Sequence, residues 1–119
     1  MVALLSRSAL EIFMTDKIVV LSTCASEQEA ETLARSLVGQ HVAACVNVIP
    51  RVRSYYRWKG SIESADEYLL VIKSSRDRMQ ALMASLEKEH SYEVPEVIAL
   101  AVVDGGPNYL NWLQASLQD

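Results

Sequence analysis

The spacing of apolar residues changes along the chain, and near its start the pattern predicts a strand followed by a helix. Residues 17–23, KIVVLST, are a short run of branched apolar residues, which is typical of a strand buried on both faces. Ser26 can cap the next helix, because Glu29 three residues later completes a capping box. Gly39 fits the C-terminal cap of that helix. Its apolar stripe comprises Ala30, Leu33, Ala34, Leu37 and Val38.

A long hairpin is predicted for the middle of the chain. Residues 42–58 are rich in branched and aromatic residues that alternate between two faces, as in a strand. Pro50 within this run predicts an edge, a bend or a bulge, because proline cannot donate to a strand ladder. Residues 59–61, KGS, fit a turn around Gly60, and residues 67–73 return as a second strand.

The last third of the chain predicts a helix, a strand and a final helix. Ser74 or Ser75 is expected to cap the first of these helices. Its buried stripe comprises Met79, Leu82, Met83 and Leu86. Residues 96–103 are typical of a buried strand, and residues 104–107, DGGP, of a turn. The final helix carries the apolar residues Tyr109, Leu110, Trp112 and Leu113.

This order of elements predicts an α+β fold, namely a ferredoxin-like βαββαβ split with a C-terminal helix. Right-handed crossovers place both main helices on one face of the sheet. The opposite face has no predicted cover, and the hairpin adds the aromatic side chains of Tyr55, Tyr56 and Trp58. Because an exposed apolar sheet face leads either to aggregation or to a partner, we expect a closed homo-oligomer.

Length and composition indicate one globular domain after a short extension. The 119 residues are 50% hydrophobic and 22% charged, as in an ordinary globular domain. Met14 opens MTDKIVVLST, which is a sensible start for such a domain. We therefore assign residues 1–14 to an N-terminal extension and residues 15–119 to the domain.

Charge, cysteine content and hydrophobicity argue against a nucleic-acid partner, a secreted protein and a membrane partner. The net charge is −4, and Lys and Arg are scattered except at Arg51, Arg53 and Arg57, so we expect no nucleic-acid partner. Cys24 and Cys45 do not make a secretory disulfide framework, which favours a reducing compartment and a cytoplasmic protein. No apolar run reaches the ~20 residues needed to cross a bilayer, so we expect no membrane partner either.

His90, within the segment EHSYEVPEV at residues 89–97, admits two interpretations. As a helix-terminal cation it would interact favourably with the helix macrodipole. As a metal ligand it would suit a soft or borderline ion such as copper or zinc, if a thiolate joined it. Its possible companions are Cys24, Cys45, Glu89 and Glu93. No CxxC, HxH or HExxH spacing marks a local metal motif, so spacing alone leaves both interpretations open.

The chain lacks the sequence marks of an enzyme. It has neither a G-x-S-x-G nucleophile elbow nor a P-loop. Glu93 and Glu96 flank Pro95, but this separation defines no acid–base geometry. A nucleophilic pair of Cys45 and His90 stays an alternative, although nothing identifies a third group to orient it. We therefore expect a protein that is not an enzyme.

Four segments together resemble the CutA family of divalent-cation-tolerance proteins. They are VAACVNVIPRVRSYYRWKG (42–60), EYLLVIKSS (67–75), HSYEVPEVIALAVVDG (90–105) and YLNWL (109–113). The resemblance runs from about Ile18 to Leu117, and the order of its motifs is specific. It implies a ferredoxin-like subunit in a homotrimer built like the PII signalling proteins, with the hairpin joining strands across subunits. It also implies a cytoplasmic, non-enzymatic protein linked to copper and other divalent cations.

The resemblance further implies a set of candidate metal ligands. The family's copper site uses a cysteine at the end of the first strand, where this chain has Ser22, and two adjacent histidines, where it has Glu89 and His90. Cys24 lies two residues beyond Ser22, and Cys45 matches the cysteine of the family's AAC motif. The expected ligands of a divalent cation, copper first, are therefore His90, Cys24, Cys45 and Glu89.

Five further residues match positions that recur in the family. They are Tyr56, Trp58, Tyr92, Glu96 and Trp112. One interpretation is packing within the trimer, and the other is an inter-subunit cleft with aromatic walls and a carboxylate that holds a small ligand. The leading hypothesis is thus a trimeric protein of the response to metal ions. The alternative is a PII-like signalling or assembly scaffold that recognises a small molecule or a protein.

Overall fold

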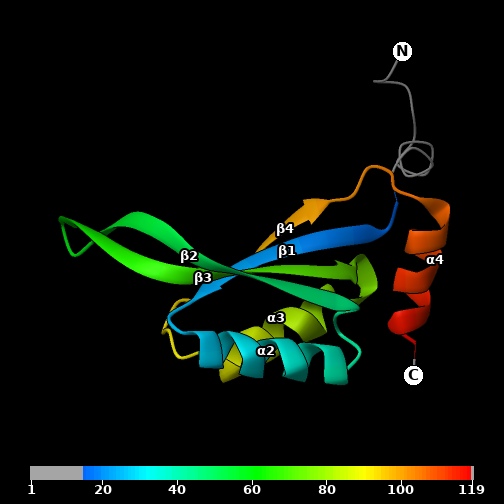
Figure 1. The fold of residues 1–119 in the computed structure, drawn as a ribbon, viewed down its shortest axis with the longest axis horizontal. Helices are drawn as coiled ribbons and strands as arrows, with labels where there is room; N and C mark the ends of the chain where they lie inside the picture. The colour runs from blue at the N-terminus through cyan, green and yellow to red at the C-terminus, as the bar shows by residue number, and fades with distance from the viewer. Residues whose placement is uncertain (1–14, 119) are drawn as a thin grey trace, which may run out of the picture.

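The computed structural model describes residues 15–118, which form a four-stranded antiparallel sheet with two helices on one face and a third helix across one end (Figure 1). The strands are β1 (Lys17–Cys24), β2 (Cys45–Trp58), β3 (Ser61–Ser75) and β4 (Ile98–Ala101), in the spatial order β2-β3-β1-β4. The helices are α2 (Glu27–Gly39), α3 (Met79–Glu89) and α4 (Pro107–Ser116), and the 3-10 helix η2 (Arg76–Arg78) precedes α3. The predicted ferredoxin-like βαββαβ order with a terminal helix is confirmed. Residues 1–14, the predicted extension, lie outside the described residues.

Helix α2 begins at the predicted capping box but ends differently from the prediction. The Ser26 hydroxyl accepts a hydrogen bond from the Glu29 N–H at 3.1 Å, and the Glu29 carboxylate accepts one from the Ala25 N–H at 3.4 Å. Gly39 is not the C-terminal cap: it is the last helical residue, and Gln40 follows as the cap. The left-handed residue is His41, with φ of 61°, and its ring nitrogen Nδ1 lies 3.3 Å from the Ser116 carbonyl oxygen.

The hairpin of β2 and β3 extends well beyond the rest of the sheet (Figure 1). Lys59 and Gly60 both have positive φ, as a tight hairpin turn with a right-handed twist requires. The register slips between Ile49 and Val52, and Arg51 has φ of 61°, so the bulge predicted from Pro50 is confirmed. Strand β3 starts at Ser61, six residues before the predicted start, because a ribbon exposed on both faces accepts polar residues.

Three predictions for the second half of the chain are wrong in detail. Ser75 precedes η2 rather than α3, and Ser74 lies inside β3, so neither serine caps the helix. In α3, Leu82 and Leu86 are buried as expected, whereas Met83 is exposed. Strand β4 covers only residues 98–101 and is exposed rather than buried, because it forms the sheet edge and no helix covers its outer side.

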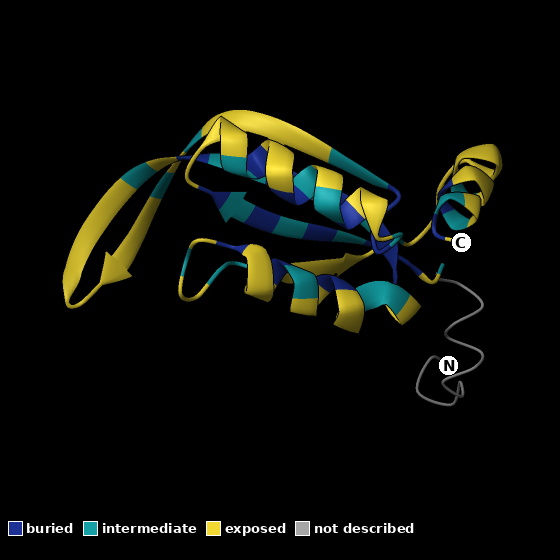
Figure 2. Cartoon of the chain, turned by 90° about the horizontal axis from the view of Figure 1, so that it is seen from below, coloured by how far each residue is buried: buried dark blue, intermediate teal, exposed yellow. Residues whose placement is uncertain are grey.

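The main core lies between the sheet and the helices α2 and α3, whose buried stripes face the strands in Figure 2. Its fully buried large side chains include Val20, Leu33, Leu37, Leu70, Ile72, Leu82 and Leu86. A smaller cluster of Ala44, Leu113 and Leu117 seats α4 at the end of the sheet. No helix within residues 15–118 is long and apolar enough to cross a membrane.

The opposite side of the sheet carries an apolar surface without cover in the single chain. Strand register places seven apolar residues on this side, which we call the open sheet face: Val19, Leu21, Ile49, Leu69, Val71, Ile98 and Leu100. Ile49, Ile98 and Leu100 keep 45%, 50% and 48% of their surface exposed, which is unusual for large apolar residues grouped on one face.

Two buried serines give a matched test of the core. Ser22 and Ser74 are both fully buried; the Ser74 hydroxyl donates to the Val42 carbonyl at 2.6 Å, whereas the Ser22 hydroxyl finds no partner among the described residues. We expect Ser74→Ala to lower the free energy of unfolding by about 1–2 kcal/mol and Ser22→Ala to leave it unchanged or raise it by up to about 1 kcal/mol. Urea unfolding measures both. A larger loss for Ser22→Ala than for Ser74→Ala would contradict this assignment.

Candidate functional site

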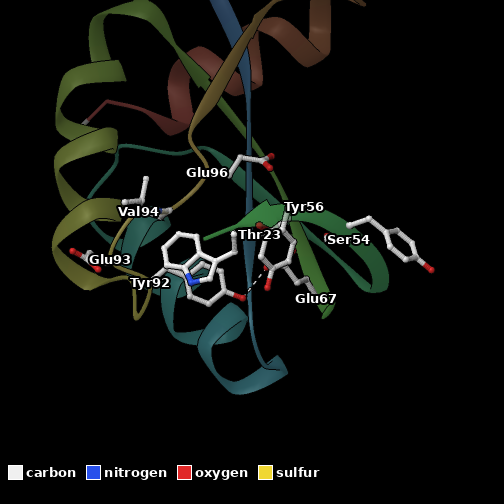
Figure 3. Close-up of a pocket in the computed structure, with 11 residues that line it drawn as sticks. Thr23, Ser54, Tyr56, Glu67, Tyr92, Glu93, Val94 and Glu96 are labelled. Atoms are coloured by element: carbon white, nitrogen blue, oxygen red, sulfur yellow. Dashed lines mark hydrogen bonds between the residues drawn. The ribbon is translucent and has the colours of Figure 1, made fainter. Parts of the chain in front are cut away.

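A cavity of about 790 Å³ lies between the base of the hairpin, the end of β1 and the segment of residues 92–96 (Figure 3). Four of the five predicted cleft residues line it: Tyr56, Trp58, Tyr92 and Glu96. The fifth, Trp112, stands on α4 beyond the other end of the sheet, where its ring lies 5.5 Å from that of Tyr109. The volume is within the usual range of small-molecule sites, which is roughly 300–1,000 Å³.

Two further carboxylates line this cavity, Glu67 and Glu93. From the sequence, Glu93 was named only as a possible companion of His90 or of Glu96, and Glu67 was missed. Glu67 is only 7% exposed, and its Oε2 accepts a hydrogen bond of 2.7 Å from the Tyr92 hydroxyl, which points toward it in Figure 3. The sequence did contain a signal for Glu67, because it lies in a predicted strand that is mostly apolar. A charge in such a strand requires a polar partner or belongs to a binding site. Burial, followed by the bond to Glu67, raises the pKa of Tyr92, so its phenol stays protonated and remains a donor at neutral pH.

The cavity is on the uncovered side of the sheet. Thr23 and Glu67 line it, and both belong to the side that carries the open sheet face, since side chains alternate along β1 and β3. The chain thus places an apolar sheet surface and an acidic, aromatic cavity next to each other.

His90 holds residues 90–92, which include the cavity residue Tyr92, against the end of β1. Its Nε2 lies 2.7 Å from the Thr23 carbonyl oxygen, and its Nδ1 accepts a hydrogen bond from the Tyr92 N–H at 3.0 Å. Because Nδ1 accepts, the proton of the neutral ring is on Nε2, which donates to Thr23. Both ring nitrogens are therefore occupied by the backbone, and the side chain is a clamp between β1 and residues 90–92.

Glu29 completes this corner from the first turn of α2. Its carboxylate accepts hydrogen bonds from the Ser91 N–H at 2.8 Å and the Ser91 hydroxyl at 2.9 Å, and it lies 3.6 Å from His90 Nδ1. Burial alone would raise the pKa of Glu29, but the bonds from Ser91 and the positive charge that the nearby His90 ring carries when protonated outweigh it and lower that pKa from its ordinary value. The capping glutamate of α2 thus also holds the end of α3.

The four predicted metal ligands are not brought together. Cys24 is buried, and burial raises the pKa of its thiol to about 11, whereas metal binding needs a thiolate. Cys45 lies on the other side of the sheet, with its sulfur 4.0 Å from the Asn47 amide oxygen, and Glu89 is exposed beside Gln40. Within residues 15–118, no group of three His, Cys, Asp or Glu side chains could hold a metal ion. The described residues do not fit a preformed metal centre.

Comparison with known proteins assigns the fold to a family. The family model of the CutA1 divalent ion tolerance protein matches residues 18–116. The "Divalent-cation tolerance protein CutA" of Yersinia pestis (strain Pestoides F) is 42% identical over 103 residues, which are 87% of this chain and 87% of that protein. The crystal structure of CutA from Xylella fastidiosa is 38% identical, with a TM-score of 0.86 over 87% of this chain and 100% of that one.

A third relative differs in its stated location. The CutA structure from Archaeoglobus fulgidus, described as a periplasmic divalent cation tolerance protein, is 28% identical with a TM-score of 0.83, over 86% of this chain and 99% of that one. The sheet order, the two covering helices and the terminal helix define a ferredoxin-like α+β domain of the CutA type. The chain belongs to the CutA1 divalent ion tolerance family.

Proposed function

We propose that the chain acts as a homotrimer in the response to divalent cations. Membership of the divalent-cation-tolerance family supports the cation role. The open sheet face supports assembly, because its seven grouped apolar residues lie on one side of a sheet that no helix covers there. A cyclic arrangement of three chains buries such a face without leaving an open end for further growth.

The free edges of the sheet support the same assembly. Strands β2 and β4 are the two edges, and each has one side without a strand partner in the single chain. The backbone groups of such an edge are ready to pair with another chain. A trimer in which the β2 edge of one subunit meets the β4 edge of the next satisfies all six edges at once. The cytoplasm is the location that we propose, because Cys24 and Cys45 are both free thiols.

Copper is the cation that we propose for this chain, bound weakly at the corner of His90. His90 contacts the carbonyl of Thr23, and the buried Cys24 is the next residue along the chain. An imidazole with a thiolate is a ligand pair that favours copper. The ion must displace a hydrogen bond of His90 and deprotonate Cys24, whose pKa is raised to about 11, so its binding is weak at neutral pH and strengthens as pH rises.

Copper titration of the metal-free protein tests this corner. We expect His90→Gln, whose amide can still donate to the Thr23 carbonyl, to weaken copper binding about tenfold or more, because an imidazole ligand is lost. Glu87→Gln is the control, since Glu87 is exposed on the same helix. Calorimetry at pH 7 and pH 8 measures both variants. Superimposable isotherms for His90→Gln and the unmodified chain would leave His90 as a structural clamp only.

The cavity favours a second candidate function, that of a PII-like scaffold which recognises a small molecule. Its volume, its aromatic walls and its position beside the open sheet face support this candidate. A ligand there would lie close to the subunit boundary of the proposed trimer, where its binding could alter assembly or the recognition of a protein partner.

A further inference from the structure

We propose that the cavity binds a bulky organic ammonium ion, such as a quaternary or alkylated amine, through a carboxylate and aromatic ring faces. This inference deepens the second candidate function, because it names the class of ligand that the scaffold would recognise.

The charge of the cavity calls for a cation. Its lining includes Glu67, Glu93 and Glu96, whereas no Lys, Arg or His is among the lining residues. Glu67 is 7% exposed and makes no ion pair within residues 15–118; its one hydrogen-bond partner there is the neutral Tyr92 hydroxyl. A buried carboxylate without a counter-ion is unfavourable, so a bound cation would supply the missing partner.

The walls of the cavity suit a cation whose charge is spread over alkyl groups. Tyr56 and Trp58 are 45% and 50% exposed in the single chain, so their rings are open to a ligand there. The faces of such rings attract weakly hydrated cations. The hairpin already displays this attraction, because Lys59 Nζ lies 5.9 Å from the centroid of the Trp58 ring and the Arg53 guanidinium carbon 6.0 Å from that of Tyr55.

A small inorganic ion fits the same cavity poorly. Magnesium and calcium need several oxygen ligands at about 2.0–2.6 Å, and the three glutamates do not form such a group. The volume of about 790 Å³ is suited to a small organic molecule rather than to a bare ion. A neutral apolar molecule would fill the space but would leave Glu67 without a counter-charge. The combination therefore favours an organic cation over a metal ion or a neutral ligand.

Choline chloride and its neutral isostere 3,3-dimethylbutan-1-ol form the test pair, because they share a shape and differ in charge. Calorimetric titration of the full chain is expected to show saturable binding of choline and binding of the isostere at least about tenfold weaker. Magnesium chloride at equal ionic strength controls for screening. Equal binding of choline and the isostere, or no saturable binding of choline, would overturn the proposal.

Variants of similar shape locate the site. Glu67→Gln keeps an acceptor for the Tyr92 hydroxyl and removes the charge, and Glu96→Gln removes a second, less buried charge. Each is expected to weaken choline binding, Glu67→Gln by about tenfold or more, whereas Glu63→Gln on the same hairpin but outside the lining should not. An equal effect of Glu63→Gln would mean that choline responds only to the overall negative charge of the protein, and this would overturn the proposal. Light scattering on the same samples separates the outcomes, because loss of the trimer tests the proposed assembly and not the ligand.

Discussion

Ile98→Glu is expected to convert a particle of about 40 kDa, three copies of the 13.2 kDa chain, into single chains. Ile98 lies on the open sheet face, in the edge strand β4, and half of its surface is exposed in the single chain. A glutamate there remains hydrated in a monomer. In a trimer that buries this face, three carboxylates would be desolvated without counter-ions, which costs several kcal/mol for each of them.

Val38→Glu is the matched control for this substitution. Val38 is 42% exposed, close to the exposure of Ile98, but it lies on α2, which covers the other face of the sheet. We expect Val38→Glu to keep the mass of the unmodified chain. Size-exclusion chromatography with light scattering at micromolar concentration measures all three proteins. If the unmodified chain already elutes as one copy, or if both variants keep the larger mass, the open sheet face is not the interface.

The parts of the fold that local sequence determines were predictable. The capping box at Ser26 and Glu29 set the start of α2, because its hydrogen bonds join residues three or four positions apart. Pro50 marked the bulge in β2, since a residue without an N–H cannot take a regular place in a ladder. The order of strands and helices then limited the topology to few arrangements, and the ferredoxin-like one is confirmed.

Features that depend on contacts between distant segments were not predictable in the same way. The pattern placed residues 96–103 in a buried strand because they are apolar, but burial depends on neighbours, and β4 has one strand neighbour and no helix over it. Gly39 satisfied a local preference for the helix end, yet His41 took the left-handed position with its ring beside the Ser116 carbonyl, 75 residues later. Long-range contacts override such local preferences.

The candidate site likewise contains residues that the sequence predicted and residues that only long-range contacts reveal. Tyr56 and Trp58 were predicted as cleft residues because they match positions that recur in the family, and both line the cavity. Glu67 and Thr23 were missed because the cavity forms only where the hairpin base, the end of β1 and residues 92–96 meet. The His90 ring was a candidate ligand by its residue type and by its match to a family position, and only the distances to Thr23 and Tyr92 reveal that both nitrogens are used by the backbone.

His90→Ala is expected to lower the free energy of unfolding by about 3 kcal/mol. The substitution removes two hydrogen bonds, leaves the Thr23 carbonyl without its donor and opens a void at a side chain that is 8% exposed. It also frees residues 90–92, so Tyr92 should lose its fixed position against Glu67. Urea unfolding at one protein concentration measures the loss, with His90→Gln as the variant that keeps a donor for Thr23. A loss as large for His90→Gln would mean that ring packing, and not the donated bond, is what stabilises this corner.

The dependence of stability on acidic pH tests the contact between Glu29 and His90. The pKa of Glu29 is lower in the folded chain than its ordinary value of 4.5, so its contribution is present above that value and is lost as pH falls through the folded pKa. In His90→Ala, one of the causes that lower this pKa is gone, so the folded pKa lies closer to its ordinary value and less stability should be lost on acidification than in the unmodified chain. His90→Gln removes the imidazole as well and should show the same smaller acid loss, although it keeps most of its stability at pH 7. An unchanged acid profile in both variants would separate His90 from Glu29 and leave Ser91 as the group that holds the carboxylate.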